Sequence, residues 1–180
     1  NRCFDENVPE EVNRKIIDHI SDINLPYSEN ARLYLIREGI HPGTIYVTGS
    51  PMAEVLDYYR ELIDKSNILK GLKLSENKYF LTSIHREENV ESQKTLSKLI
   101  DSLNAVAGDY KIPIIVSTHP RTANRLQEYN FKINKLITFH QPFGYFDYVK
   151  LEKNAFCVLS DSGTIQEESS IFGFAAIQIT

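Results

Sequence analysis

From residue 78 onward, short apolar runs of strand length alternate with stretches in which apolar residues recur every three or four positions. The runs predict five strands, at residues 79–84, 112–118, 136–139, 156–160 and 175–179, and four helices between them, at residues 91–107, 121–129, 145–153 and 163–171. Strands that are separated by helices pair in parallel through crossover connections. The pattern therefore predicts an α/β fold with a doubly wound, Rossmann-like parallel sheet.

The residues before position 78 predict fewer strands and more helix. The pattern predicts helices over residues 9–22, from Ser28 to Gly39 and over residues 51–64, and a strand over residues 44–48. Pro9 suits the first position of the first helix, and Ile16 and Ile20 are spaced to face a core. Residues 66–77 have weak periodicity and many Gly, Ser, Asn and Lys residues, which is typical of a linker.

The charge and the apolar runs of the sequence disfavour nucleic acid and membrane as partners. The 180 residues include 20 Lys and Arg against 24 Asp and Glu, a formal net charge of −4. Binding to a nucleic-acid backbone needs a basic stripe, and a membrane span needs a longer apolar run than any in this sequence, so we expect neither partner. Cys3 and Cys157 lie far apart and without metal-ligand spacing. This predicts no disulfide scaffold, no metal site and a reducing, cytoplasmic location.

The loops that follow the strands are the expected ligand-binding segments, because ligands of parallel sheets bind there. The fourth strand leads through Asp161 to Ser162, Gly163 and Thr164, which offer hydroxyls and backbone amides at the positive end of a helix dipole. A phosphate could approach the backbone at Gly163, and Glu168 one turn later could accept hydrogen bonds from sugar hydroxyls. The loop therefore predicts a sugar-nucleotide site, and the alternative is an ordinary N-cap and tight turn.

Histidines follow two further strands at the same edge of the sheet. His85 and Arg86 come directly after the first strand, where both side chains could reach a phosphate, and the alternative for His85 is a surface loop histidine. His119 is either a second anion contact or part of the start of a helix. The sequence lacks the motifs of dinucleotide, P-loop, zincin and hydrolase sites, which disfavours those functions.

Five motifs follow one another along the chain: VPEEVNR at 8–14, IYVTG at 45–49, IHREEN at 84–89, THP at 118–120 and DSGTIQEE at 161–168. In this order they resemble the non-hydrolysing UDP-N-acetylglucosamine 2-epimerases, over essentially the whole chain. The segments NRCFD at 1–5 and TGSPM at 48–52 are similar to the branch that forms UDP-N-acetyl-L-fucosamine. Thr164 also fits that branch, because the main branch commonly has Gly at this position.

The resemblance implies two Rossmann-like domains in the glycosyltransferase-B arrangement, a UDP-sugar substrate between them and a homodimer at full length. Residues 1–50 would form the C-terminal part of the first domain, 51–77 a connecting helix and linker, and 78–180 the nucleotide-binding domain, incomplete at its C-terminus. The implied reaction is 2-epimerisation of a UDP-N-acetylhexosamine, by elimination and re-addition of UDP and without a cofactor. The sugar would be of the UDP-GlcNAc/UDP-ManNAc type or of the 6-deoxy-L-talosamine to L-fucosamine type.

The resemblance also implies roles for single residues. His85 falls on a catalytic histidine that contacts the diphosphate, and Glu10 falls on one of the catalytic carboxylates. The positions that it implies for substrate binding are Arg86, His119, Ser162, Gly163, Thr164 and Glu168. Among these, the Ser-Gly turn would bind the diphosphate and Glu168 the ribose hydroxyls, whereas Arg86 and His119 fall on positions linked to a second, activating UDP-sugar site.

Two other functions stay open at this point. A UDP-sugar-dependent glycosyltransferase would share the nucleotide-binding domain, and a non-catalytic UDP-binding fragment of a split gene would bind without turnover. The family's remaining catalytic carboxylates would precede Asn1, and an Arg-Pro-Glu-type motif would follow Thr180. We therefore expect this chain to be a fragment that is inactive alone.

Overall fold

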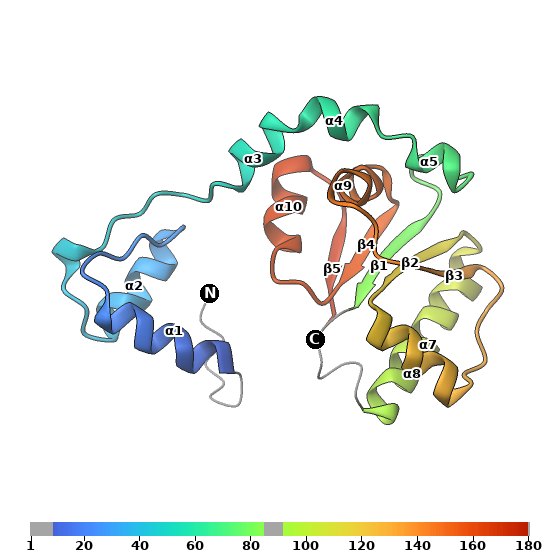
Figure 1. Cartoon of the computed structure of the whole chain (residues 1–180), viewed down its shortest axis with the longest axis horizontal. Coiled ribbons are helices and arrows are strands. Elements are labelled where there is room, and N and C mark those ends of the chain that lie inside the picture. The colour runs from blue at the N-terminus through green and yellow to red at the C-terminus, as the bar shows by residue number, and fades with distance from the viewer. Residues whose placement is uncertain (1–8, 85–91, 180) are drawn as a thin grey trace. The chain divides into compact units, whose positions relative to one another are not determined.

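The computed structural model describes residues 9–84 and 92–179. The chain divides into two compact units, Asn1–Ala53 and Glu54–Thr180, and each is described by itself. Figure 1 labels the elements of both.

The first unit contains helices α1 (Pro9–Ile20) and α2 (Glu29–Arg37) and the short 3₁₀ helix η1 (Pro42–Thr44). The Ser28 side chain caps α2 by accepting a hydrogen bond from the Ala31 amide, as the sequence predicted. The expectation that Ile16 and Ile20 face a core is wrong for the unit as described, because their side chains are 55% and 76% exposed. The described residues of this unit contain no sheet against which α1 could pack.

The strand predicted over residues 44–48 does not form as a regular strand. Thr44 is the last residue of η1, and Ile45 pairs in parallel with Asn24 through a single bridge. The Asn24 amide donates to the Thr44 carbonyl at 2.9 Å, and the Tyr46 amide donates to the Asn24 carbonyl at 3.0 Å. The Thr48 amide also donates to the Pro26 carbonyl at 3.1 Å, but within the described residues no further segment pairs with these two and no regular strand forms.

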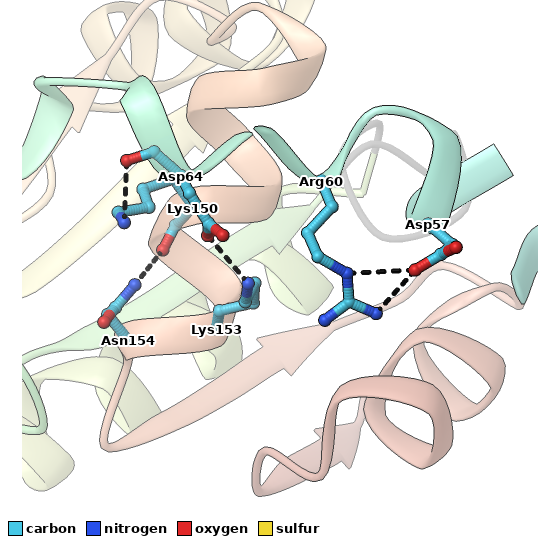
Figure 2. A network of polar contacts seen from close by, with 6 residues as sticks. All are labelled: Asp57, Arg60, Asp64, Lys150, Lys153 and Asn154. Carbon is cyan, nitrogen blue, oxygen red and sulfur yellow. Dashed lines mark hydrogen bonds and ion pairs between the residues drawn. The ribbon is translucent and has the colours of Figure 1, made fainter. Parts of the chain in front are cut away.

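Helix α3 (Met52–Tyr58) leads into the second unit and is followed by α4 (Arg60–Lys65) and α5 (Ile68–Gly71). The single helix predicted over 51–64 is therefore two helices that meet at Tyr59. Figure 2 shows how α4 is attached to α9 (Tyr145–Asn154): the Lys153 ammonium lies 3.0 Å from the Asp64 carboxylate, and Lys150 donates to the Asp64 carbonyl at 3.3 Å. Residues 54–77 thus belong to the second unit, and α5 contributes Ile68 and Leu69 to its core.

The second unit is built on a five-stranded parallel sheet with the order β3-β2-β1-β4-β5. The strands are β1 (Phe80–Ile84), β2 (Ile114–Thr118), β3 (Ile137–His140), β4 (Cys157–Ser160) and β5 (Ala176–Gln178). The helices that connect them are α7 (Gln93–Tyr110), α8 (Pro120–Tyr129), α9 and α10 (Ile165–Phe172). This confirms the prediction of a doubly wound parallel α/β sheet, and each strand begins one or two residues after its predicted start.

Alternate side chains along the strands fill two cores, one on each face of the sheet. Phe80 and Ile84 pack with α7 on one face, whereas Leu81 packs with α9 and α10 on the other. A strand that is covered on both faces buries its side chains against helices on each side of the sheet, so every position favours an apolar residue. This explains why the predicted strands are contiguous apolar runs. Cys157 on β4 is buried and carries a free thiol.

No helix in the described ranges is both long and apolar enough to span a bilayer.

Candidate functional site

The strand order sets the position of the site. The chain winds outward from β1 through β2 to β3 and then crosses back to β4, so the order reverses between the neighbouring strands β1 and β4. Ligands of open parallel sheets bind beyond the carboxyl ends of the strands at this reversal. The loop after β4 begins there, at Asp161. The loop after β1 holds His85 and Arg86, and these two predicted residues lie outside the described residues.

The loop after β4 is tied to the sheet and closed by its own hydroxyls. Asp161 is fully buried, and its amide donates to the Ser83 carbonyl of β1 at 3.3 Å. The Ser162 amide donates to the Ser160 hydroxyl at 3.0 Å. The hydroxyls of Ser162 and Thr164 lie 2.9 Å apart, and the Thr164 amide donates to the Ser162 hydroxyl at 3.3 Å. Two of the amides that we expected to be available are thus used inside the loop, and two hydroxyls are gathered at the N-terminus of α10.

Gly163 leaves open space in this loop. Its φ is not positive, and a Cβ added to it would meet no atom within 4 Å outside its neighbours. Neither backbone strain nor crowding among the described residues requires glycine at this position. Glycine here instead leaves the backbone accessible, and that is the property a phosphate would need.

Glu168 lies on the first turn of α10, directly behind the loop. It is only 8% exposed, and the Thr164 hydroxyl donates to its carboxylate at 3.4 Å. Burial raises the pKa of Glu168, the hydrogen bond from Thr164 lowers it in part, and the charge on Glu167 raises it further. The structure therefore brings together Ser162, Gly163, Thr164 and Glu168, and their role in binding a ligand stays a prediction.

Two other predicted residues are carried by other elements. Glu10 is exposed on α1 in the first unit, whereas its neighbour Glu11 is fully buried, with the Arg14 guanidinium 3.6 Å from its carboxylate. His119 is exposed and follows β2, so β1 lies between its strand and the loop of Gly163. Its carbonyl accepts the Ala123 amide at 3.1 Å in the first turn of α8, in agreement with the expected helix start.

Sequence reasoning missed a buried carboxyl beside this site. Glu152 on α9 is fully buried, and neither of its oxygens has a hydrogen-bond partner within 3.5 Å among the described residues. Burial, and after it the charge on Glu168, raise the pKa of Glu152 to about 9, although the nearby Tyr148 hydroxyl offsets part of this shift. Glu152 lies in the middle of a helix between Lys150 and Lys153, and no motif of the sequence marks it.

A pocket of about 680 Å³ opens at the carboxyl ends of β2 and β3, beside α8. Thr118, His140 and Gln141 contribute polar groups to its lining, and Leu126 and Phe139 contribute apolar surface. The His140 ring lies 5.5 Å from that of Phe143. In the described ranges no three His, Cys, Asp or Glu side chains gather in a way that could hold a metal ion.

Comparisons with known proteins agree with this geometry. All 180 residues match the protein family described as UDP-N-acetylglucosamine 2-epimerase. A curated UDP-N-acetylglucosamine 2-epimerase from Methanocaldococcus jannaschii is 36% identical over 99% of this chain and 50% of its own length. A curated epimerase of the same name from Methanococcus maripaludis is 35% identical, with the same coverage. The chain thus spans about half the length of the curated relatives it matches.

Solved structures give the same result. The structure of a UDP-N-acetylglucosamine 2-epimerase from Rickettsia bellii has a TM-score of 0.89 and 47% identity, over 100% of this chain and 48% of that one. The M. jannaschii UDP-GlcNAc 2-epimerase in complex with UDP-GlcNAc and UDP has a TM-score of 0.88 and 36% identity, over 98% and 50%. With a family match along its whole length, this chain belongs to the UDP-N-acetylglucosamine 2-epimerase family.

Proposed function

We propose that this chain is the UDP-binding part of a UDP-N-acetylhexosamine 2-epimerase. The observation that carries the proposal is the loop after β4, where an open glycine and two hydroxyls lie beside the buried carboxyl of Glu168 at the reversal of strand order. An anion suits the loop because the N-terminus of α10 favours negative charge. The carboxyl behind it suits a sugar hydroxyl, so the two together suit a nucleoside diphosphate.

The proposed reaction breaks the C1–O bond and removes the proton from C2, so that UDP leaves with the bonding electrons and a glycal forms. UDP then adds back to C1 while a proton is delivered to the opposite face of C2. Negative charge develops on the diphosphate in the first step. Preorganised donors that meet such charge are each worth about 3–4 kcal/mol in kcat, and we assign this role to His85, the turn at Ser162 and Gly163, and the α10 dipole.

The remaining roles follow the resemblance. Glu168 accepts hydrogen bonds from the ribose, and Thr164 orients it through the 3.4 Å contact. Glu10 acts in proton transfer at C2. Arg86 and His119 belong to a second, activating UDP-sugar site.

We also propose the finer assignments that the resemblance implies. Thr164 favours the L-fucosamine-forming branch over the UDP-GlcNAc/UDP-ManNAc type. Residues 1–50 belong to the first Rossmann-like domain, and the exposed apolar residues of α1 support their membership in a larger domain. The complete protein is cytoplasmic and forms a homodimer, whereas the 180-residue chain alone is inactive.

Gly163→Ala tests the phosphate site. The added methyl group has free space in the protein, so the free energy of unfolding should change by less than about 1 kcal/mol. The same methyl group would lie where a phosphate approaches the backbone and would remove a hydrogen bond to a charged group. Calorimetry should therefore show UDP affinity at least about tenfold weaker. Gly108→Ala is the matched control, because Gly108 is equally open but lies on α7. Equal UDP affinity of the two variants would refute the phosphate assignment.

Glu168→Gln tests the ribose contact. An amide presents one acceptor oxygen and no charge, so UDP affinity should fall by roughly tenfold, whereas affinity for inorganic pyrophosphate, which has no ribose, should change little. Calorimetric titration of both ligands against the wild-type chain and the variant measures the difference. If the variant loses the same factor for both ligands, Glu168 does not bind the ribose.

A further inference from the structure

The buried carboxyl of Glu152 belongs to a polar stripe on one side of α9. Tyr145, Tyr148 and Glu152 are three and then four residues apart, so they lie above one another on the same side of the helix. This side meets Glu168 of α10, whose charge acts on all three groups, and Ser83 of β1, which hydrogen-bonds to Tyr148. The stripe therefore connects α9 with the end of β1 and with α10, which carries the Glu168 carboxyl of the proposed nucleotide site.

The lysines of α9 do not neutralise this stripe. Lys153 pairs with Asp64 on α4, and Lys150 donates to the Asp64 carbonyl, as Figure 2 shows. The titratable groups of the described residues that act on Glu152 are Glu168 and Tyr148, and neither is a cation. The Tyr148 hydroxyl lowers the pKa of Glu152 only in part. A fully buried carboxylate without a cation is costly, whereas the protonated acid carries no charge and gains an O–H donor.

We propose that Glu152 is a positioning residue of the nucleotide site, which stays protonated beside Glu168 and so makes Glu168 the ionised member of a buried carboxyl pair. The inference rests on the proposed function, because it takes UDP as the ligand that contacts Glu168. Glu152 itself does not contact this ligand.

The two carboxyls have different surroundings, and this decides which of them ionises first. Glu168 retains slight exposure and accepts a hydrogen bond from Thr164, whereas Glu152 has no exposure. Burial raises the pKa of Glu152 most and the charge on Glu168 raises it further, whereas the hydrogen bond from Thr164 offsets part of the effect of burial on the pKa of Glu168. Ionisation of Glu152 would place a second negative charge behind a site that binds an anion.

A carbon-13 NMR titration of the side-chain carboxyls tests the pair without any ligand. The Glu152→Gln and Glu168→Gln variants assign the two signals. In the wild-type chain the Glu152 carboxyl should titrate near pH 9, and the Glu168 signal should show a second, small step at the same pH. That second step should vanish in Glu152→Gln. Titration of Glu152 in the ordinary range of glutamate, about pH 4–5, would overturn the proposal.

Calorimetry with UDP tests the coupling to the site. One pH unit above its pKa only about a tenth of Glu152 remains protonated, so the affinity of the wild-type chain relative to Glu152→Gln should fall by about tenfold between pH 8 and 10. The uracil ring also loses a proton in this range, but the ratio of the two proteins cancels that effect. A constant ratio would overturn the coupling.

A second pair of variants separates positioning from simple filling of space. At pH 7.5, Glu152→Gln keeps an N–H donor and Glu152→Met does not, so UDP should bind the Gln variant several-fold more tightly. Equal affinities would contradict a positioning role. If UDP binds none of these proteins, including the wild-type chain, the proposed function fails, and the NMR titration still decides whether the carboxyl pair exists.

Discussion

Replacing Glu152 by glutamine is expected to remove a steep loss of stability as pH rises. The pKa of Glu152 is about 9 in the folded chain, against 4.5 for an exposed glutamate. Between these values the folded state binds one more proton than the unfolded state, so this contribution is fully present below about pH 4.5 and is lost as pH rises toward 9. The slope is about 1.4 kcal/mol per pH unit. Glutamine does not titrate, so its variant lacks this slope.

Urea unfolding at pH 5, 7 and 9 measures the difference. The chain contains no Trp, so far-ultraviolet circular dichroism is the suitable signal. Asp64 does not affect the comparison between pH 5 and 9. The hydrogen bond from Lys153 lowers the pKa of Asp64, so its contribution to the free energy of unfolding is lost only at acidic pH. The difference in free energy of unfolding, Glu152→Gln minus wild type, should grow by several kcal/mol from pH 5 to 9. Parallel pH profiles would show that Glu152 is ionised in the folded chain.

The sheet could be predicted because each of its strands is marked locally. Residues such as Leu81, Ile115 and Val158 lie in contiguous apolar runs, and a strand that is covered on both faces needs such a run. Residues 44–48 carry the same β-branched signal, yet they form a single bridge. A strand needs neighbours as well as propensity, and among the described residues this segment has one neighbour only.

The part of the candidate site that is local in sequence could also be predicted. Ser162, Gly163 and Thr164 form a local turn at a helix start, and the residues that make such a turn are adjacent in the sequence. Glu152 is different, because its burial arises from the packing of α9 against the sheet and α10. Lys150 and Lys153 lie on either side of it in the sequence, and no motif marks it as buried. Its position depends on tertiary contacts that no local pattern records.

The 180-residue chain alone is expected to bind UDP and yet to show no exchange of the C2 hydrogen of UDP-GlcNAc in D₂O. Epimerisation needs charge stabilisation at the diphosphate and proton transfer on both faces of C2. We assign the first to the strand-end loops, but Glu10 is the one residue here to which we assign proton transfer. Losing a catalytic acid or base typically costs about 10²–10⁴-fold in rate, and losing the orientation of the substrate can cost about 7–11 kcal/mol. Together these losses place turnover below detection.

A fusion protein distinguishes missing catalytic residues from a damaged nucleotide site as the cause of inactivity. The part of the R. bellii relative that this chain does not match, about half of that protein, can be joined to it. Proton NMR of UDP-GlcNAc in D₂O should then show exchange at C2 and appearance of the epimer. In the fusion, Glu10→Gln should lower turnover by about 10²–10⁴-fold and weaken UDP binding much less, whereas Glu29→Gln on the exposed first turn of α2 should change neither. Rapid C2 exchange by the 180-residue chain alone would contradict the assignment of proton transfer to residues outside it, because every group needed for the reaction would then lie between Asn1 and Thr180.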